Sequence, residues 1–287
     1  MTSTCWQIIF SPAETPDENF SLFLDDFFEV NAQNYSDSGE DEYIGYQSGE
    51  FDEQTMLNAA AALKLTLPPY RISELKSENW LKDYVIKFEP FEIADFCIYG
   101  IHETAVPQTN KIPLQIYAAT AFGSNHQTTQ SCINALSELH ASGFTPQHIL
   151  DVGTGSGILS LCAAKLWPKA KILASDIDDE AVVVTNSNSQ TNQLQKQIEA
   201  VQSDGYQNPS VSQRAPYDLI LSNILANPLI AFSADLSKNL KTAGYCVLSG
   251  FVEDQTEDVV SAHQQQGLKL IKLYSLDNWR AALMQKV

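Results

Sequence analysis

Hydrophobic positions follow a regular alternation from about residue 126 to the end of the chain. Short apolar runs are separated by longer amphipathic stretches, which predicts strands joined by helices in a mostly parallel sheet. The predicted helices are 128–141, 157–167, 178–193, 228–241 and 254–266. The predicted strands are 148–152, 171–176, 198–202, 217–223, 244–250, 268–276 and 279–286.

The last two predicted strands, 268–276 and 279–286, are separated by too few residues for a helical crossover. A parallel connection needs a dozen or more residues, so these strands must pair as an antiparallel hairpin. The expected fold of this part is therefore α/β, with a Rossmann-like, mostly parallel sheet of seven strands that ends in a hairpin.

The front of the chain has a different pattern, with apolar residues on short strands and on two helical stretches. The predicted elements are strands at 6–10, 43–46 and 70–75 and helices at 17–30 and 52–65. The phenylalanines of the first helix recur at helical spacing, which indicates core packing. The polar stretch 31–42 is predicted to be a loop. The pattern locates three of the four strands in the order strand-helix-strand-strand-helix-strand, and we interpret this part as a small α+β module that resembles a ferredoxin-like fold.

In the segment between these two parts, at 76–115, the apolar residues Trp80, Tyr84, Ile86 and Phe88 suggest extended structure, and prolines punctuate it. We interpret it as a connection that partly packs on the α/β part. The expected organisation is an acidic α+β domain at 1–90, a linker at 91–115 and an α/β domain at 116–287.

The negative charge of the chain is concentrated at its front. The formal net charge is −18, and residues 1–100 carry 19 acidic and 5 basic side chains, against 16 acidic and 12 basic in the remainder. This excess argues against nucleic acid as a direct partner. It is either a solubilising surface or a means of steering a basic partner to the front domain.

The sequence contains no apolar run of eighteen or more residues, so neither a membrane span nor a membrane partner is expected. Its N-terminus lacks the basic and apolar regions of a signal peptide. The five cysteines are scattered, and none stand at metal-ligand spacing. This distribution favours reduced thiols over a disulfide framework or a metal site, and a cytoplasmic location.

The strongest chemical signal is the glycine-rich turn Gly-Thr-Gly-Ser-Gly at 153–157, between a predicted strand and a predicted helix. Glycines permit a tight turn and close approach of a ligand, and the helix N-terminus presents free N–H groups. A dinucleotide fingerprint would place a third glycine where this chain has Ile158. The spacing therefore favours a smaller ligand, S-adenosylmethionine, whose amino-acid end would lie against the loop.

A carboxylate stands at the end of the next predicted strand. Asp176 follows Gly153 by 23 positions, and a carboxylate there can accept hydrogen bonds from both hydroxyls of a ribose. The alternative is that Asp176 caps the helix directly after it, although Asp178 and Asp179 are placed to do the same. We favour the ribose role for Asp176, with Asp178 and Asp179 as caps.

Asn223 ends the predicted strand 217–223 and faces the same crevice, because ligands of open α/β sheets bind at the carboxyl ends of strands. Its amide offers an acceptor and two donors without charge, which suits the positioning of a neutral amine nucleophile. A simple turn role is the alternative. The polar segment 121–129 supplies further groups that could close over a ligand, unless Thr128 or Thr129 only caps the next helix.

Together, the glycine loop, the strand-end acid and the terminal hairpin resemble the class I methyltransferases that use S-adenosylmethionine. The Asn-Ile-Leu-Ala tetrad at 223–226, with an Ala-Phe-Gly…His…Thr-Thr segment at 121–129, resembles more specifically the PrmA family, which methylates large-subunit ribosomal protein eleven. Gly-Ser-Gly-Ile-Leu-Ser at 155–160 and Asp-Ile-Asp at 176–178 match as well. The resemblance runs from about residue 110 to the C-terminus, and the front domain matches only in layout.

The resemblance implies that Thr129, Gly153, Asp176 and Asn223 bind the cofactor, together with Gly155 of the same loop. It implies a basic ribosomal protein as substrate, methylated on lysine or N-terminal amines and captured by the front domain. Asn223 is then also the candidate catalytic residue, which orients the amine. The chain departs from the family upstream of the first helix, where its loop is about one residue shorter and lacks a second glycine.

The strand-end tetrad separates this chain from neighbouring families. Glutamine methyltransferases of release factors and many nucleic-acid amine methyltransferases carry Asn-Pro-Pro-aromatic there, and the absence of that rigid di-proline favours a flexible aliphatic amine as the methyl acceptor.

Other classes of protein stay open: a methyltransferase of this fold for another protein or a small molecule, and a module that binds the cofactor without turnover. A nicotinamide-dependent dehydrogenase is disfavoured by Ile158.

Overall fold

The computed structural model describes residues 5–12, 16, 18–28, 30–34, 42–49, 51–75, 88–117 and 127–287. By its internal contacts the chain divides into two compact units, Met1–Tyr84 and Val85–Val287. The boundary therefore lies between residues 84 and 85, whereas the sequence suggested boundaries at 90 and 116. By the same division, the expected linker 91–115 belongs to the second unit.

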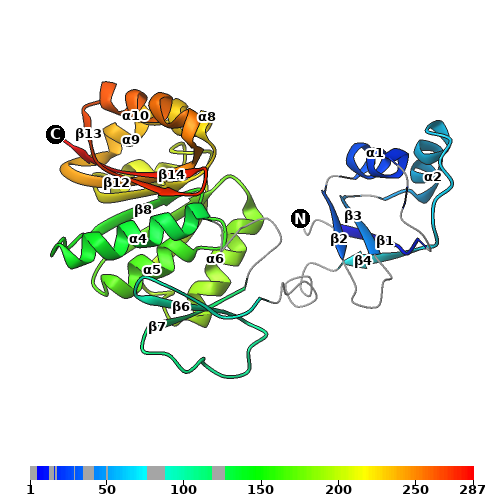
Figure 1. Ribbon diagram of the computed structural model, residues 1–287, viewed down its shortest axis with the longest axis horizontal. Coiled ribbons are helices and arrows are strands. Elements are labelled where there is room, and N and C mark those ends of the chain that lie inside the picture. The colour runs from blue at the N-terminus through cyan, green and yellow to red at the C-terminus, as the bar shows by residue number, and fades with distance from the viewer. Residues whose placement is uncertain are drawn as a thin grey trace. The chain divides into compact units, whose positions relative to one another are not determined.

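The described part of the first unit is a four-stranded antiparallel sheet with two helices packed on one face (Figure 1). Its elements are β1 (Cys5–Phe10), α1 (Glu18–Phe27), β2 (Val30–Asn34), β3 (Glu42–Ser48), α2 (Glu53–Ala62) and β4 (Tyr70–Leu75). The strands lie in the order β2-β3-β1-β4, which confirms the predicted ferredoxin-like arrangement. The prediction of a loop from residue 31 was wrong, because pairing with β3 overrides the low strand propensity of Val-Asn-Ala-Gln-Asn.

The core of the first unit is aromatic. Phe10 of β1 meets Phe20 and Phe23 of α1 edge-on, with ring centroids 5.4 and 6.2 Å apart, a geometry favoured by the ring quadrupoles. Met56 and Ala60 of α2 close the same cluster. The phenylalanines at helical spacing are therefore core residues, as predicted.

Within residues 127–287 the second unit contains a seven-stranded sheet in the order β10-β9-β8-β11-β12-β14-β13. The strands are β8 (His148–Val152), β9 (Lys171–Asp176), β10 (Ile198–Gln202), β11 (Tyr217–Asn223), β12 (Leu240–Val252), β13 (Leu268–Leu276) and β14 (Trp279–Lys286). The first five run parallel, and β14 is antiparallel to both β12 and β13. The predicted parallel sheet with a terminal hairpin is confirmed, although β12 extends beyond the expected 244–250.

Helices cover both faces of this sheet, with α4, α5 and α6 on one side and α8, α9 and α10 on the other (Figure 1). Their bounds are α4 Gln127–Ala141, α5 Ile158–Leu166, α6 Asp179–Thr191, α7 Pro209–Arg214, α8 Ala226–Ala231, α9 Ser233–Asn239 and α10 Thr256–Gln265. The helix predicted at 228–241 is interrupted at Phe232, whose ψ of 2° is not helical. The short α7 escaped prediction, although Asn208 caps it and Pro209 begins it.

Residues 88–117 contain a second, three-stranded sheet of β5 (Phe91–Ile93), β6 (Phe96–Gly100) and β7 (Ile112–Ile116). Phe96, Ile98, Leu114 and Ile116 are fully buried in the same core as α4 and α5. This segment was expected to be a connection because prolines usually interrupt strands. Proline is tolerated at a sheet edge, and Pro113 lies in β7, the edge strand of this sheet.

In the parts of the chain that the structure describes, no helix is long and apolar enough to cross a membrane. Cys97, Cys132, Cys162 and Cys246 are buried and free of disulfide bonds. Burial raises the pKa of Cys132 to about 12, so this thiol stays protonated and unreactive at neutral pH.

Met56 and Leu57 are neighbours on α2 that test the core of the first unit. Met56 is fully buried and Leu57 is 38% exposed. We expect Met56→Ala to lower the free energy of unfolding of this unit by about 2–5 kcal/mol, because it leaves a cavity, and Leu57→Ala to change it by less than about 0.5 kcal/mol. Urea unfolding of both variants measures the difference, and equal losses would contradict the assignment of the core.

Candidate functional site

The glycine loop at 153–157 joins β8 to α5 at the carboxyl edge of the sheet. Gly153, Gly155 and Gly157 have φ angles of +73°, +57° and +80°, a region that strains residues with a side chain. A Cβ atom on Gly153 would also lie 2.1 Å from Cγ2 of Ile224. The glycines are therefore required by the conformation of the loop, and at 153 by the contact with the strand-end tetrad as well.

Asp176 lies directly against this loop. Its Oδ2 accepts a hydrogen bond from the Gly155 N–H at 2.9 Å, its Oδ1 accepts one from the Asp178 N–H at 3.2 Å, and the residue is buried. The N-cap of α6 is Asp178, whose Oδ1 accepts the Glu180 N–H at 2.9 Å. Asp179, also expected to cap, is instead the first residue of α6, where its negative charge interacts favourably with the helix dipole. The cap alternative for Asp176 is thus excluded, and its ribose role stays a prediction.

The structure brings Asn223 and Thr129 together. The Nδ2 of Asn223, at the end of β11, donates to Oγ1 of Thr129, in the first turn of α4, at 3.2 Å. Because α4 begins at Gln127, Thr128 and Thr129 both lie inside the helix and neither caps it. Residues 121–126 of the predicted polar segment lie outside the described residues.

Asp151 is a buried acid below the glycine loop for which no role was predicted from the sequence. Its Oδ2 accepts hydrogen bonds from Oγ1 of Thr154 at 2.8 Å and Oγ of Ser160 at 2.6 Å. Its Oδ1 is buried and has no hydrogen-bond partner in the described part of the chain. Burial raises the pKa of this carboxyl group to about 6, against the lowering effect of the two hydroxyls. The acid directly before Val-Gly at a strand end was the available signal.

The carboxyl ends of β8 to β11 carry acidic groups and no basic ones. The turns directly after these strands, at 153–157, 177–180, 203–208 and 224–228, contain no Lys or Arg. Their acids are Asp178, Asp179, Glu180 and Asp204, which join Asp176. This edge would repel a ligand with several phosphates and attract one that carries positive charge and hydroxyl groups. The side chains present therefore fit S-adenosylmethionine, with its sulfonium, ammonium and ribose, better than a dinucleotide.

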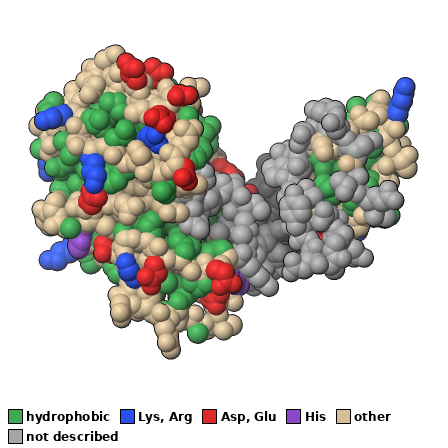
Figure 2. Space-filling view, viewed as in Figure 1, with side chains coloured by type: hydrophobic (Ala, Val, Ile, Leu, Met, Phe, Trp, Pro, Cys, Tyr) green, Lys and Arg blue, Asp and Glu red, His purple; other side chains and the backbone are tan. Residues whose placement is uncertain are grey.

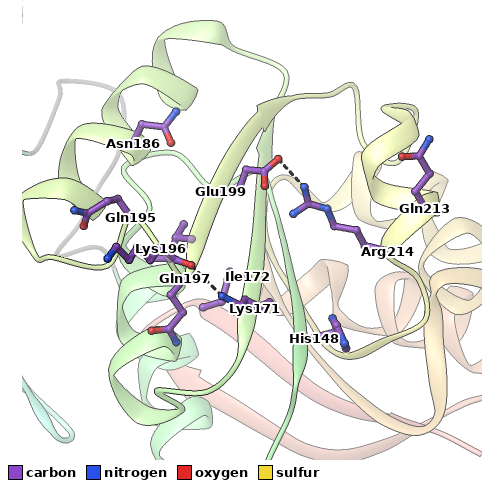
Figure 3. A pocket seen from close by; sticks show the side chains of 11 residues that line it. His148, Lys171, Ile172, Asn186, Gln195, Lys196, Gln197, Glu199, Gln213 and Arg214 are labelled. Carbon is purple, nitrogen blue, oxygen red and sulfur yellow. Dashed lines mark hydrogen bonds and ion pairs between the residues drawn. The ribbon is translucent and has the colours of Figure 1, made fainter.

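A cavity of about 700 Å³ lies at the opposite, amino-terminal edge of the sheet (Figure 3). It is lined by basic and amide side chains, and two of the basic groups bond neighbouring protein groups. Arg214 pairs with Glu199 at 2.6 Å, and Nζ of Lys171 donates to the backbone carbonyl of Lys196 at 3.1 Å. None of the site residues predicted from the sequence lines it. The candidate site is therefore the carboxyl edge.

The strand order, the terminal hairpin and the glycine loop with its neighbouring acid define a class I methyltransferase. A solved structure shares this fold: the ribosomal protein L11 methylase from Lactobacillus delbrueckii subsp. bulgaricus has a TM-score of 0.62 at 24% identity, over 70% of this chain and 100% of that one. The family model of ribosomal protein L11 methyltransferase (PrmA) matches residues 16–287, and the chain belongs to this family.

Two curated relatives carry the same name. The ribosomal protein L11 methyltransferase of Rhodopseudomonas palustris is 32% identical over 228 residues, which cover 79% of this chain and 75% of the relative. That of Brucella suis is 34% identical over 209 residues, which cover 72% of this chain and 73% of the relative. The expected family resemblance is thereby confirmed, and the chain is an enzyme of the methyltransferase class.

Gly153 and Gly143 form a matched pair for the steric role of the loop. Both have φ above +70°, but a Cβ on Gly143 would meet nothing within 4 Å. Each alanine variant should lose about 1–2 kcal/mol of unfolding free energy through backbone strain. Gly153→Ala should lose about 1–3 kcal/mol more through the clash with Ile224. Denaturant unfolding of the two variants measures the extra loss, and equal stability would refute the contact.

Proposed function

We propose that this chain transfers methyl groups from S-adenosylmethionine to lysine or N-terminal amines of ribosomal protein L11. The observation that carries the proposal is the hydrogen bond between Asn223 and Thr129 beside the glycine loop. Asn223 offers an uncharged amide to an amine nucleophile, and the turns that follow β8 to β11 carry no Lys or Arg that would repel a basic substrate. The names of the relatives support the choice of substrate.

Five residues would hold the cofactor: Thr129, Gly153, Gly155, Asp176 and Asn223. Bound S-adenosylmethionine supplies an electrophilic methyl group on a positively charged sulfur. The left-handed glycines let the backbone approach its amino-acid end, and Asp176 is the acceptor for the ribose hydroxyls. The acidic groups around the loop offset the positive charge of this ligand.

Asn223 would orient the substrate amine. Because its Nδ2 is directed at Thr129, its Oδ1 is the atom that accepts a hydrogen bond from the amine and aims the nitrogen lone pair at the methyl carbon. The amine must be neutral to attack, and desolvation lowers its pKa from about 10.4 in water. Orientation of this kind can contribute up to about 7–11 kcal/mol, so the reaction needs little further catalysis.

The acidic front unit would capture the basic substrate in the cytoplasm. Residues 1–84 carry 16 acidic and 4 basic side chains, and such an excess attracts a basic protein at distances up to about one Debye length. The larger unit adds exposed carboxylates of its own at Glu253, Asp254, Glu257 and Asp258. Figure 2 shows red carboxylate side chains gathered at the end of that unit where α10 lies.

Transfer of labelled methyl groups to purified ribosomal protein L11 tests the proposal. We expect label on the protein with the wild-type enzyme, and at least about 100-fold slower transfer with Asn223→Ala, since the orienting group is lost. Ser222→Ala is the matched control, because Oγ of Ser222 only donates to the Val152 carbonyl at 3.2 Å. No label despite measurable cofactor binding would overturn the substrate, and unchanged transfer by Asn223→Ala would remove that residue from the mechanism.

Capture by charge makes the affinity for the protein substrate depend on salt. We expect the Kd for ribosomal protein L11 to rise by at least about tenfold between 50 and 500 mM NaCl, because exposed charges are screened. Titration calorimetry at several salt concentrations measures this change. The affinity for S-adenosylhomocysteine serves as the reference, and equal salt dependence of the two affinities would count against electrostatic capture.

A further inference from the structure

Two asparagines of α6 bond the outer edge of β7 in the same way. Asn192 accepts the Gln115 N–H on its Oδ1 at 3.0 Å and donates from its Nδ2 to the Gln115 carbonyl at 2.7 Å. Asn188 accepts the Tyr117 N–H at 2.8 Å and donates to the Tyr117 carbonyl at 3.0 Å. Each side-chain amide thus pairs with both backbone groups of one residue, as a residue of a neighbouring strand would.

The spacing of the two asparagines explains why a helix can substitute for a strand here. Four residues of a helix rise about 6.0 Å, and two residues of a strand span about 6.6 Å. Positions 188 and 192 therefore match 117 and 115, whose backbone groups face the same side. Pro113 lies two residues earlier on that side, so its missing N–H costs no bond to β6.

Asn188 differs from Asn192 because it also reaches the glycine loop. Its Nδ2 donates a further hydrogen bond to the Ser156 carbonyl at 2.8 Å, and the residue is fully buried. One turn before it, Oγ1 of Thr185 donates to the Gly155 carbonyl at 3.0 Å. Helix α6 therefore holds two successive carbonyl groups of the loop.

The direction of these carbonyls sets the direction of the loop amides. In a planar trans peptide the C=O and N–H groups point in opposite directions. With the Gly155 carbonyl held by Thr185, the N–H of Ser156 is directed away from α6. The Gly157 N–H, in the next peptide, donates to the Thr154 carbonyl at 2.9 Å and closes the turn. An unheld loop could rotate these peptides at little cost, because glycine tolerates many backbone conformations.

We infer that Asn188, supported by Thr185, is a positioning residue for methyl-donor binding: it fixes the peptide orientation of the glycine loop and ties that loop to the end of β7. The inference rests on the proposed function, in which this loop receives S-adenosylmethionine. Asn188 acts through the loop backbone and touches neither substrate. Asn192 has the same bonds to β7 without the bond to the loop, so it separates loop positioning from the support of β7.

Asn188→Asp and Asn192→Asp make the matched comparison in the full-length chain. Each replaces a donor by an acceptor opposite a backbone carbonyl and weakens the edge of β7, so both should lower the Tm. Only Asn188→Asp also places an acceptor against the Ser156 carbonyl. We expect its Kd for S-adenosylhomocysteine, measured by titration calorimetry, to rise at least tenfold, against less than threefold for Asn192→Asp. Equal changes in the two variants would overturn the inference.

Thr185→Val provides a second variant in case Asn188→Asp does not fold. It removes the bond to the Gly155 carbonyl with little change in shape. We expect the Kd for S-adenosylhomocysteine and the KM for S-adenosylmethionine to rise about three- to tenfold, with the KM for the protein substrate unchanged. An unaltered Kd would contradict loop positioning. If the wild-type chain itself binds no S-adenosylhomocysteine, the proposed function fails, and the inference fails with it.

Discussion

The left-handed glycine loop is the constraint on which the rest of the larger unit depends. Its peptide groups are bonded from several directions: the Ser175 carbonyl accepts the N–H groups of Gly153 and Thr154, and Asp176 accepts that of Gly155. Helix α6 holds the carbonyls of the next turn. Because Gly153 has no side chain, Ile224 at the end of β11 can pack closely against it. The loop thereby joins the ends of β8, β9 and β11 to α6, and these are the elements that supply the predicted site residues.

Acidic and basic side chains lie at opposite edges of the seven-stranded sheet. The carboxyl ends of β8 to β11 gather carboxylates and lack Lys and Arg, while the cavity at the amino ends is lined by Lys171, Lys196 and Arg214. A cationic methyl donor and a basic protein would both be attracted to the first edge. Asp151 adds a buried acid at the same carboxyl edge. Burial raises the pKa of Asp151 to about 6, although its bonds to the Thr154 and Ser160 hydroxyls lower it, so the neutral form becomes accessible.

The local hydrophobic pattern was sufficient to predict the bounds of strands that are buried along most of their length. Strands β8, β9 and β11 are apolar runs that end in a turn signal, and their bounds agree with prediction. The pattern failed where distant partners decide the structure. The edge of β7 is completed by Asn188, 71 residues from Tyr117, so Pro113 appeared to break a strand that a helix in fact supports. Asp151 was overlooked because its role follows from burial, and Asn188 because an asparagine in a helix has no distinctive spacing.

An enzyme that works mainly by orienting its two reactants depends on contacts that hold the orienting groups in place. Methyl transfer from a sulfonium needs the amine nitrogen, the methyl carbon and the sulfur in line, and a small displacement of either reactant lowers the rate steeply. The amine would be aimed by one amide at Asn223, which Thr129 orients. The donor would be aimed by the backbone peptides of the glycine loop. The rigidity of those peptides must come from outside the loop. The buried amide of Asn188 supplies it, because its three hydrogen bonds join the Ser156 carbonyl to the backbone of Tyr117.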